Sequence, residues 1–386
     1  MQPTRERERK KSREGTHRDR ETKRREREEM EGEKGRVCVT GGTGFIASWL
    51  VMKLLQHGYS VNATIRSHPQ SKKDVSYLTN LPGASEKLRI YNADLSDPSS
   101  FEAAIEGCIG VFHVAHPIDF EDTEPEETVT KRSVEGTLGI LKACLNSKTV
   151  KRVVYTSSTS AVEYNDKGGD IKDESSWSDV DFLKALNYWG LSYMISKTMT
   201  ERAALDFAHE HGLDLVTVIP SFVVGPFICP RFPGSVNAAL ALVLGDQQHY
   251  HFLMSVSMVH VDDVCSAHIF LLEYPDAKGR YICSSDRLTL NEMSEFLSAK
   301  YPQLPIPTID SLKEVQGMEH LASRQRSYWI LGSSISMGWM RCLMKQFNAA
   351  KRRGFSSSCL AQYHGFSLFC ATLRQIKTLI LLSQSY

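Results

Sequence analysis

The sequence of 386 residues contains no hydrophobic run of the length that a membrane-spanning helix needs. It also lacks a CxxC pair, and its nine scattered cysteines argue against a disulfide framework or a zinc site. Net charge is nearly absent, since the formal value is +1, and this argues against a general nucleic-acid binder. We therefore expect a cytoplasmic protein with reduced thiols and without a metal, a nucleic-acid partner or a membrane span.

The first 34 residues have few large apolar side chains and many charges of both signs. Such a segment cannot bury enough apolar surface to offset its ordering entropy, so we predict that residues 1–34 are disordered. They match neither a secretory signal nor an ordinary transit peptide. A nucleic-acid-binding tail is one interpretation, and a dispensable extension is the favoured one.

Short β-branched segments alternate with helical patterns from residue 36 onward. The expected strands are residues 36–40, 60–65, 88–92, 109–114, 152–156 and 213–219, and the expected helices are residues 45–57, 98–107, 124–147 and 190–211. This alternation predicts an α/β fold of the Rossmann type, a doubly wound parallel sheet covered on both faces. Residues 35–220 should form this domain. Residues 221–322 are expected to form a smaller C-terminal lobe over the strand ends, with some segments returning to the sheet.

A glycine-rich turn follows the first expected strand, where residues 40–47 read TGGTGFIA. Glycines permit a tight turn and let backbone N–H groups approach a pyrophosphate at a helix N-terminus. Because the motif follows a strand and opens a helix, we predict dinucleotide binding over a purely structural turn. The residues expected to contact the cofactor here are Gly41, Thr43, Gly44, Phe45 and Ile46.

Arg66 follows the second expected strand, where an acidic residue would bind the ribose of NAD. Together with Lys73 it suits a 2′-phosphate, so we predict NADP(H) as the cofactor and residues 35–220 as its binding domain. A solvated basic loop is the alternative. Asp94, followed by Leu95 after the third strand, is expected to reach the adenine, although Asp94 could instead cap a helix.

Tyr193 and Lys197 are four residues apart in an expected helix and therefore share one of its faces. An ammonium lowers the pKa of a nearby phenol, which can then deliver a proton to a carbonyl oxygen as hydride arrives from a nicotinamide cofactor. A serine at the end of the strand at residues 152–156 can donate to the same oxygen. This set predicts a carbonyl reductase.

These motifs resemble the plant dihydroflavonol reductase group of extended short-chain dehydrogenases/reductases, especially its vestitone reductase-like members. The resemblance runs from about Gly35 to about Met318 and includes residues 36–45, Tyr193-x-x-x-Lys197, residues 220–226 and residues 258–263. It implies a catalytic set of Ser158, Tyr193 and Lys197, with Ser158 preferred to Ser157. It also implies that Val114, Ala115, Pro220, Val223 and Ser235 border the cofactor.

Three positions depart from the family pattern. Ala47 replaces the third glycine of the turn, which serves helix packing and should tolerate a methyl group. His116 stands beside the expected substrate where Ser or Thr is usual, with a solvent-facing loop residue as the alternative. Glu163 stands where dihydroflavonol reductases have a substrate-binding Asn, and its carboxylate would accept but not donate. Dihydroflavonol itself is therefore a doubtful substrate.

The final 64 residues, 323–386, do not follow the family pattern, which ends with a strand and an acidic amphipathic helix. Read in a shifted frame, codons for residues 338–355 can encode such a helix. We hypothesise a frameshift near residues 322–324, and an aberrant tail after it that weakens stability and closure of the lobe. The segment that begins at Met30 resembles the start of family members, which suggests Met30 as the initiator. Genuine divergent ends are the alternative, and an uninterrupted transcript frame would exclude the frameshift.

The predicted function is NADPH-dependent reduction of a flavonoid or related phenolic ketone to the alcohol. A sugar-nucleotide epimerase or dehydratase is an alternative, because those enzymes share the catalytic set, but they keep NAD bound and Arg66 argues against NAD. A catalytically weak NADP-binding protein is the third interpretation, given the tail. The sequence does not determine the oligomeric state, and a monomer is favoured.

Overall fold

The computed structural model describes residues 34–66, 74–117, 123–166, 172–186, 190–285 and 287–313. Of the predicted disordered extension it includes Lys34 alone. Lys73 and the predicted aberrant tail at residues 323–386 lie outside the described residues.

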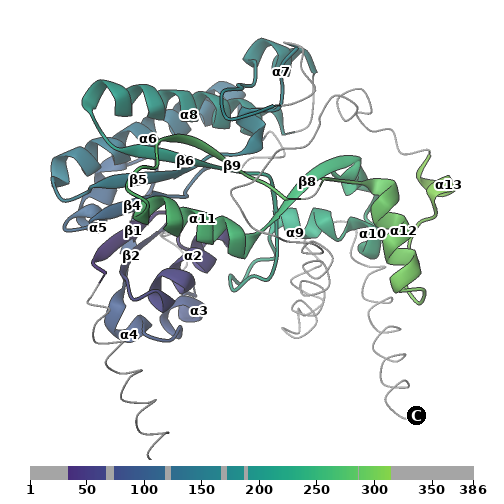
Figure 1. Cartoon of the computed structure of the whole chain (residues 1–386), viewed down its shortest axis with the longest axis horizontal. Helices are drawn as coiled ribbons and strands as arrows, with labels where there is room; N and C mark the ends of the chain where they lie inside the picture. Colours follow the sequence, from purple (N-terminus) through teal and green to yellow (C-terminus); the bar gives the residue numbers. More distant parts are fainter. Residues whose placement is uncertain are drawn as a thin grey trace, which may run out of the picture.

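Seven described strands form one parallel sheet in the order β3-β2-β1-β4-β5-β6-β9 (Figure 1). They are β1 (Arg36–Val39), β2 (Ser60–Ile65), β3 (Leu88–Asn92), β4 (Gly110–His113), β5 (Arg152–Thr156), β6 (Leu215–Pro220) and β9 (Gly279–Cys283). β1, β2, β4, β5 and β6 are buried along almost their whole length, as expected for parallel strands covered on both faces. The chain runs outward from β1 to β3 and then crosses to β4 on the other side of β1. Ligands of such sheets bind where the direction reverses.

Helices cover both faces of this sheet (Figure 1). On one face lie α2 (Phe45–Gln56) and α11 (Val261–Glu273), and on the other lie α5 (Glu102–Ile105), α6 (Glu126–Ser147) and α8 (Leu191–His211). The shorter elements of this part are α3 (Ser76–Thr79), α4 (Ala84–Lys87), the 3₁₀ turns η1 (Pro98–Phe101) and η2 (Thr159–Ala161), and α7 (Val180–Leu186). The predicted Rossmann architecture is therefore confirmed.

A smaller lobe has its own three-stranded sheet, in the order β10-β8-β7, and its own apolar core. Its strands are β7 (Phe222–Val224), β8 (Ser255–His260) and β10 (Arg287–Thr289). Its helices are α9 (Gly234–Ala239), α10 (Ala241–Leu244), η3 (Gln247–Leu253), α12 (Leu290–Lys300) and α13 (Ile309–Leu312). Between β8 and β10 the chain returns to the large sheet as α11 and β9, so the lobe is not one continuous segment.

The expected strands lie where the β-branched pattern predicts them, with ends that differ by at most two residues. The helical segment expected at residues 98–107 is helical from Pro98 to Ile105, as a 3₁₀ turn followed by the four-residue helix α5. Helix α6 approaches this segment closely, since a Cβ on Gly139 would lie 2.1 Å from Cβ of Pro98. Among the described residues, no helix has the length and hydropathy needed to cross a bilayer.

Candidate active site

A cleft of about 1080 Å³ lies at the carboxyl ends of the strands of the large sheet, between this sheet and the small lobe. Every predicted site residue that the structure describes lines it: Gly41, Thr43, Gly44, Phe45, Ile46, Arg66, Asp94, Leu95, Val114, Ala115, His116, Ser158, Glu163, Tyr193, Lys197, Pro220, Val223 and Ser235. Lys73 lies outside the described residues. Residues up to 194 positions apart in the sequence thus meet in one cavity.

The glycine turn presents backbone donors to this cleft. Gly41 has a left-handed φ of 72°, and a Cβ there would lie 3.1 Å from Cα of Ala115. Gly42 N–H donates to the carbonyl oxygen of Thr64 at 2.7 Å, which joins the turn to the end of β2. At the start of α2, Gly44 provides no side-chain cap and the first turn has no acidic residue. Uncapped N–H groups at the start of a 12-residue helix fit a pyrophosphate.

A buried hydrogen-bond chain joins the glycine turn to the end of β4. Thr40 Oγ1 accepts from the N–H groups of Val114 and Ala115, both at 3.0 Å, so its own proton is donated to His113 Nδ1 at 2.9 Å. His113 Nε2–H then donates to Thr137 Oγ1 at 2.9 Å. Burial, and next the charge of Lys197, lower the pKa of His113 to about 3. The ring therefore stays neutral, as this chain requires.

Arg66 and Asp94 lie in the same cleft, beyond the ends of β2 and β3. Arg66 is exposed, and its position fits the predicted contact with a 2′-phosphate. Asp94 Oδ1 accepts from Ser96 N–H at 2.8 Å, so its carboxylate supports its own loop. It is not the N-cap of the following 3₁₀ turn, where Asp97 stands instead.

Ser158, Tyr193 and Lys197 come from two elements, the end of β5 and the start of α8. Lys197 Nζ donates to the carbonyl oxygen of Thr156 at 2.8 Å, which fixes the helix to the strand. Ser158 lies in the cleft and is hydrogen-bonded to Tyr193. Ser157 Oγ instead donates to the buried carboxylate of Glu201 at 2.6 Å. This geometry favours Ser158 over Ser157 as the serine that reaches a substrate.

Burial shifts the pKa values of Tyr193 and Lys197 in opposite directions. Burial raises the pKa of Tyr193, and the hydrogen bond with Ser158 lowers it. Burial lowers the pKa of Lys197 to about 7, and the carboxylate of Glu201 opposes that change. A neutral phenol beside a lysine near its titration point is suited to proton transfer near neutral pH.

His116 lies against the proposed proton donor. Its ring meets the ring of Tyr193 edge to face, at 86° and 5.7 Å between centroids. Its Nε2 is 2.9 Å from Ser196 Oγ, and because that hydroxyl donates to the carbonyl oxygen of Tyr193, Nε2–H is the donor. Burial, and then Lys197, hold the pKa of His116 well below its ordinary value. His116 is therefore a neutral residue of the cleft and not a solvent-facing loop residue.

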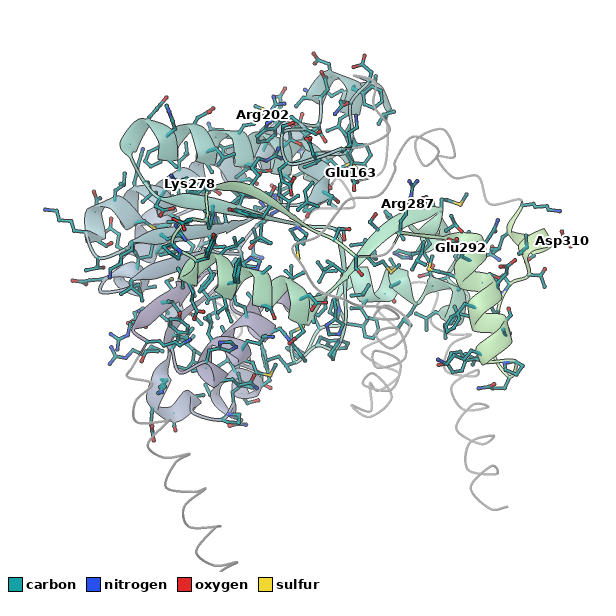
Figure 2. All side chains as sticks on the ribbon, viewed as in Figure 1. Glu163, Arg202, Lys278, Arg287, Glu292 and Asp310 are labelled. Atoms are coloured by element: carbon teal, nitrogen blue, oxygen red, sulfur yellow. The ribbon has the colours of Figure 1, made fainter. Side chains whose placement is uncertain are left out.

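Glu163 lines the cleft just after η2, beyond the carboxyl end of β5, and Arg287 lies on β10 of the small lobe (Figure 2). Burial raises the pKa of Glu163 to about 7, while a hydrogen bond with Thr159 and the charge of Arg287 act in the opposite direction. The carboxylate and the acid are thus both populated near neutral pH. The acid can donate a hydrogen bond, so the expectation that Glu163 only accepts applies to its carboxylate form.

Several residues of the cleft were not found from the sequence. Ser221 follows β6, and its buried Oγ has no hydrogen-bond partner among the described residues, so it can bond a bound molecule. The small lobe adds the side chains of His249, His251 and Phe252 from η3, and Tyr164 lines the same cleft from the segment after η2. His249, His251 and Phe252 fall in the run QQHYHF at residues 247–252. Its high content of ring side chains is the sequence feature that could have indicated these cleft residues.

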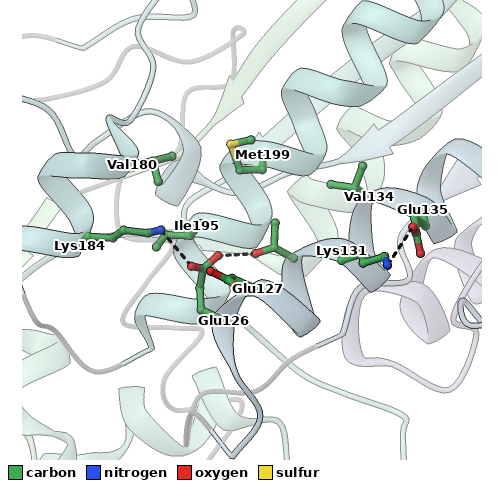
Figure 3. Close-up of a pocket in the computed structure, with 10 residues that line it drawn as sticks. Glu126, Glu127, Lys131, Val134, Glu135, Val180, Lys184, Ile195 and Met199 are labelled. Carbon is green, nitrogen blue, oxygen red and sulfur yellow. Dashed lines mark hydrogen bonds and ion pairs between the residues drawn. The ribbon is translucent and has the colours of Figure 1, made fainter.

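A second hollow of about 410 Å³ lies on the outer surface of α6, α7 and α8 (Figure 3). Its charged rim consists of surface pairs, Lys184 with Glu126 at 3.4 Å and Lys131 with Glu135 at 3.9 Å. None of the predicted site residues lines it. Among the described residues, no group of three or more His, Cys, Asp and Glu side chains is placed to hold a metal ion.

Known proteins are similar to this chain in sequence and in fold. The sequence profile of the NAD dependent epimerase/dehydratase family matches residues 37–283. Vestitone reductase of Medicago sativa is 59% identical over 284 residues, which cover 74% of this chain and 87% of that protein. Dihydroflavonol 4-reductase of Zea mays is 50% identical over 275 residues, 71% of this chain and 77% of that protein. The crystal structure of vestitone reductase from alfalfa matches with a TM-score of 0.71 at 50% identity, over 84% of this chain and 100% of that chain.

Proposed function

The chain belongs to the NAD dependent epimerase/dehydratase family, and from this premise we propose that it is an NADPH-dependent reductase of a flavonoid or related phenolic ketone. The observation that carries the proposal is that one cleft contains both the glycine turn and the Ser158, Tyr193 and Lys197 side chains. Relatives named for the reduction of vestitone and of dihydroflavonol support the substrate class.

The cofactor would lie along the carboxyl edge of the large sheet. The start of α2 would bind its pyrophosphate, and the orphan hydroxyl of Ser221 offers a further hydrogen bond deep in the cleft. Arg66 supports NADP(H) over NAD(H), because a guanidinium pairs with a 2′-phosphate and would leave no acceptor for a ribose hydroxyl. When bound, NADPH supplies the hydride that converts the carbonyl carbon to an alcohol carbon.

The residues of the chain would manage the carbonyl oxygen. Ser158 Oγ donates a hydrogen bond to this oxygen, and the phenol of Tyr193 transfers its proton to it. Lys197 follows Tyr193 by one helical turn, and its ammonium stabilises the phenolate that remains. The carbonyl oxygen of Thr156 holds that ammonium in place.

A screen for NADPH oxidation with the purified full chain tests this proposal. The substrates are a panel of flavonoid and phenylpropanoid carbonyls, each offered with NADPH and separately with NADH, and the products are identified. We expect NADPH-dependent formation of an alcohol from at least one phenolic ketone. Binding of NADPH without turnover of any ketone would contradict it, and NAD retained through purification would support an epimerase instead.

A further inference from the structure

The buried carboxylate of Glu201 lies next to the segments that carry the proposed catalytic residues, and it has no part in the proton transfer described for them. Glu201 is 0% exposed and follows Lys197 by one helical turn on α8. Its Oε2 accepts from Ser157 Oγ at 2.6 Å, and Ser157 is the residue directly before Ser158. Glu201 thus joins the two segments that carry the proposed catalytic side chains.

Arg280 of β9 pairs with the carboxylate of Glu201 within the core. Its Nε and Nη2 donate to the two carboxylate oxygens at 2.8 and 3.2 Å. Its Nη1 donates to the carbonyl oxygens of Glu174 and Ser176, and its guanidinium lies 3.7 Å from the centroid of the Trp177 ring. Four of the five N–H groups of Arg280 are therefore engaged, which fixes the position of the carboxylate.

The charged and titratable groups near Lys197 come from four segments. Tyr155 of β5 has its ring centroid 5.5 Å from Lys197 Nζ, and burial holds its pKa well above the ordinary value. His113 and His116 are neutral, and Tyr193 is a neutral phenol on the same helix. Unlike these uncharged groups, Glu201 carries a negative charge, and this charge favours the ammonium form of Lys197.

We propose that Glu201, held by Arg280, is a positioning residue of this site: it fixes the Ser157–Ser158 segment to α8 and places a negative charge behind Lys197. The inference rests on the proposed function, because it assigns a task within that site. Its first test, however, needs no turnover.

Glu201→Gln is the primary variant, since it keeps the side-chain shape and removes the charge. The readout is the pH dependence of Lys197 acetylation by limiting acetic anhydride, measured by peptide mass spectrometry on the cofactor-free full chain. We expect the apparent pKa of Lys197 to fall by about one unit relative to the wild type, as for loss of a nearby opposite charge. A folded variant with the wild-type titration of Lys197 would overturn the proposal.

Asp214→Asn is the matched control. Asp214 pairs with Arg152 at 2.9 Å, and the Arg152 side chain is 7% exposed, as is that of Arg280. This pair lies at the amino end of β5, whereas Ser157 and Ser158 follow its carboxyl end. The control removes a carboxylate from an equally buried arginine, and we expect the titration of Lys197 to remain as in the wild type.

Ser157→Ala separates the two parts of the proposal, because it breaks the bond to the serine segment and leaves the Glu201–Arg280 pair intact. With a ketone that is turned over, we expect kcat to fall roughly tenfold or more with a smaller change in KM for NADPH. Wild-type kcat in this variant would overturn the proposal even if Glu201→Gln fails to fold.

The pH profile of kcat provides the last readout. In Glu201→Gln the loss of kcat at alkaline pH should begin at lower pH, because Lys197 gives up its proton earlier. Glu201→Asp keeps the charge and should restore the wild-type profile, and failure of that rescue would contradict the charge role. If the wild type turns over no ketone, the proposed function fails, and the acetylation of Lys197 still decides this inference.

Discussion

At the residue scale, neutral histidines inside the protein link the cleft to its supporting strands. His113 connects the glycine turn to α6, and His268 of α11 accepts from Thr156 Oγ1 at 2.7 Å at the end of β5. Burial is the main cause that lowers their pKa values, to about 3 for His113 and about 4 for His268. Each ring accepts one hydrogen bond and donates another, which for His268 runs from Nδ1–H to the carbonyl oxygen of Val264 at 2.7 Å. Only the neutral form can do both, so protonation would break the hydrogen bond that the ring accepts.

This arrangement predicts acid sensitivity with a definite sign. The unfolded chain takes up these protons near pH 6.5, whereas the folded protein does not until about pH 3–4, so stability is lost as the pH falls between those values. In His113→Gln the slope of the unfolding free energy against pH between about 4 and 6 should decrease by up to about 1.4 kcal/mol per pH unit. Urea denaturation at stepped pH measures it, and an unchanged slope would contradict a neutral His113.

The predicted preference for NADPH over NADH depends on Arg66. In Arg66→Ala the Kd for NADPH should rise roughly tenfold or more, because a charged hydrogen bond to the 2′-phosphate is lost, while the Kd for NADH should change little. Fluorescence titration measures both. Arg89→Ala is the control, since Arg89 is an exposed cation of β3 outside the cleft. Equal losses for NADPH and NADH in Arg66→Ala would refute a 2′-phosphate contact.

Much of the site could be predicted at this scale because its motifs are local. The glycine turn and the Tyr193 and Lys197 pair each lie within a few residues of sequence, and the structure brings them to one cleft. Glu201 and Arg280 are 79 residues apart, and no periodicity pairs them. The prediction for Glu163 from the sequence, namely that it accepts hydrogen bonds but does not donate them, was also incomplete. Burial raises the pKa of this residue, and burial is a property of the fold.

At the element scale, the packing of α6 positions the loop that follows β3. A Cβ on Gly136 would lie 2.8 Å from the carbonyl oxygen of Leu95, and one on Gly139 would lie 2.1 Å from Cβ of Pro98. Helix α6 therefore touches this loop with its backbone. Because Leu95 lines the cleft, the close approach also fixes one wall of the cleft.

Gly139→Ala should overpack this contact. We expect the unfolding free energy to fall by about 1–3 kcal/mol, since Pro98 cannot rotate away from the added methyl group. Glu135→Ala on the same helix is the control, because its side chain is 64% exposed and its loss should change stability by no more than about 0.5 kcal/mol. Chemical denaturation compares them, and equal stability of the two variants would show that the loop yields freely.

The large sheet was predictable because its strands are apolar, β-branched and separated by helical patterns. Expected and observed bounds agree for β2, β3 and β5. The small sheet was not predicted, since β7 and β10 have three residues each and β10 pairs with β8 across an intervening helix and strand. The segment at residues 98–107 was expected to be helical and is so from Pro98 to Ile105, but its division into a 3₁₀ turn and a short α-helix was not predicted.

At the scale of the whole molecule, the cleft is formed by two parts of the fold, the large sheet and the small lobe. The large sheet supplies the turn and the proposed catalytic side chains, and the small lobe supplies the opposite wall through η3 and α9. The return of α11 and β9 to the large sheet ties the lobe to it, and Arg280 of β9 connects this return to Glu201 behind the site. The domain limits at residues 220 and 322 and the hypothesis of a shifted reading frame remain predictions.

The central claim is that this cleft reduces a carbonyl with a proton from Tyr193. The most direct measurement compares kcat for NADPH-dependent ketone reduction in the wild type and in Tyr193→Phe, with the Kd for NADPH measured in both. We predict a loss of kcat of at least about 100-fold, with NADPH binding retained, because the variant lacks the proton donor and keeps the shape of the ring. A Tyr193→Phe protein that turns over at the wild-type rate would contradict the account.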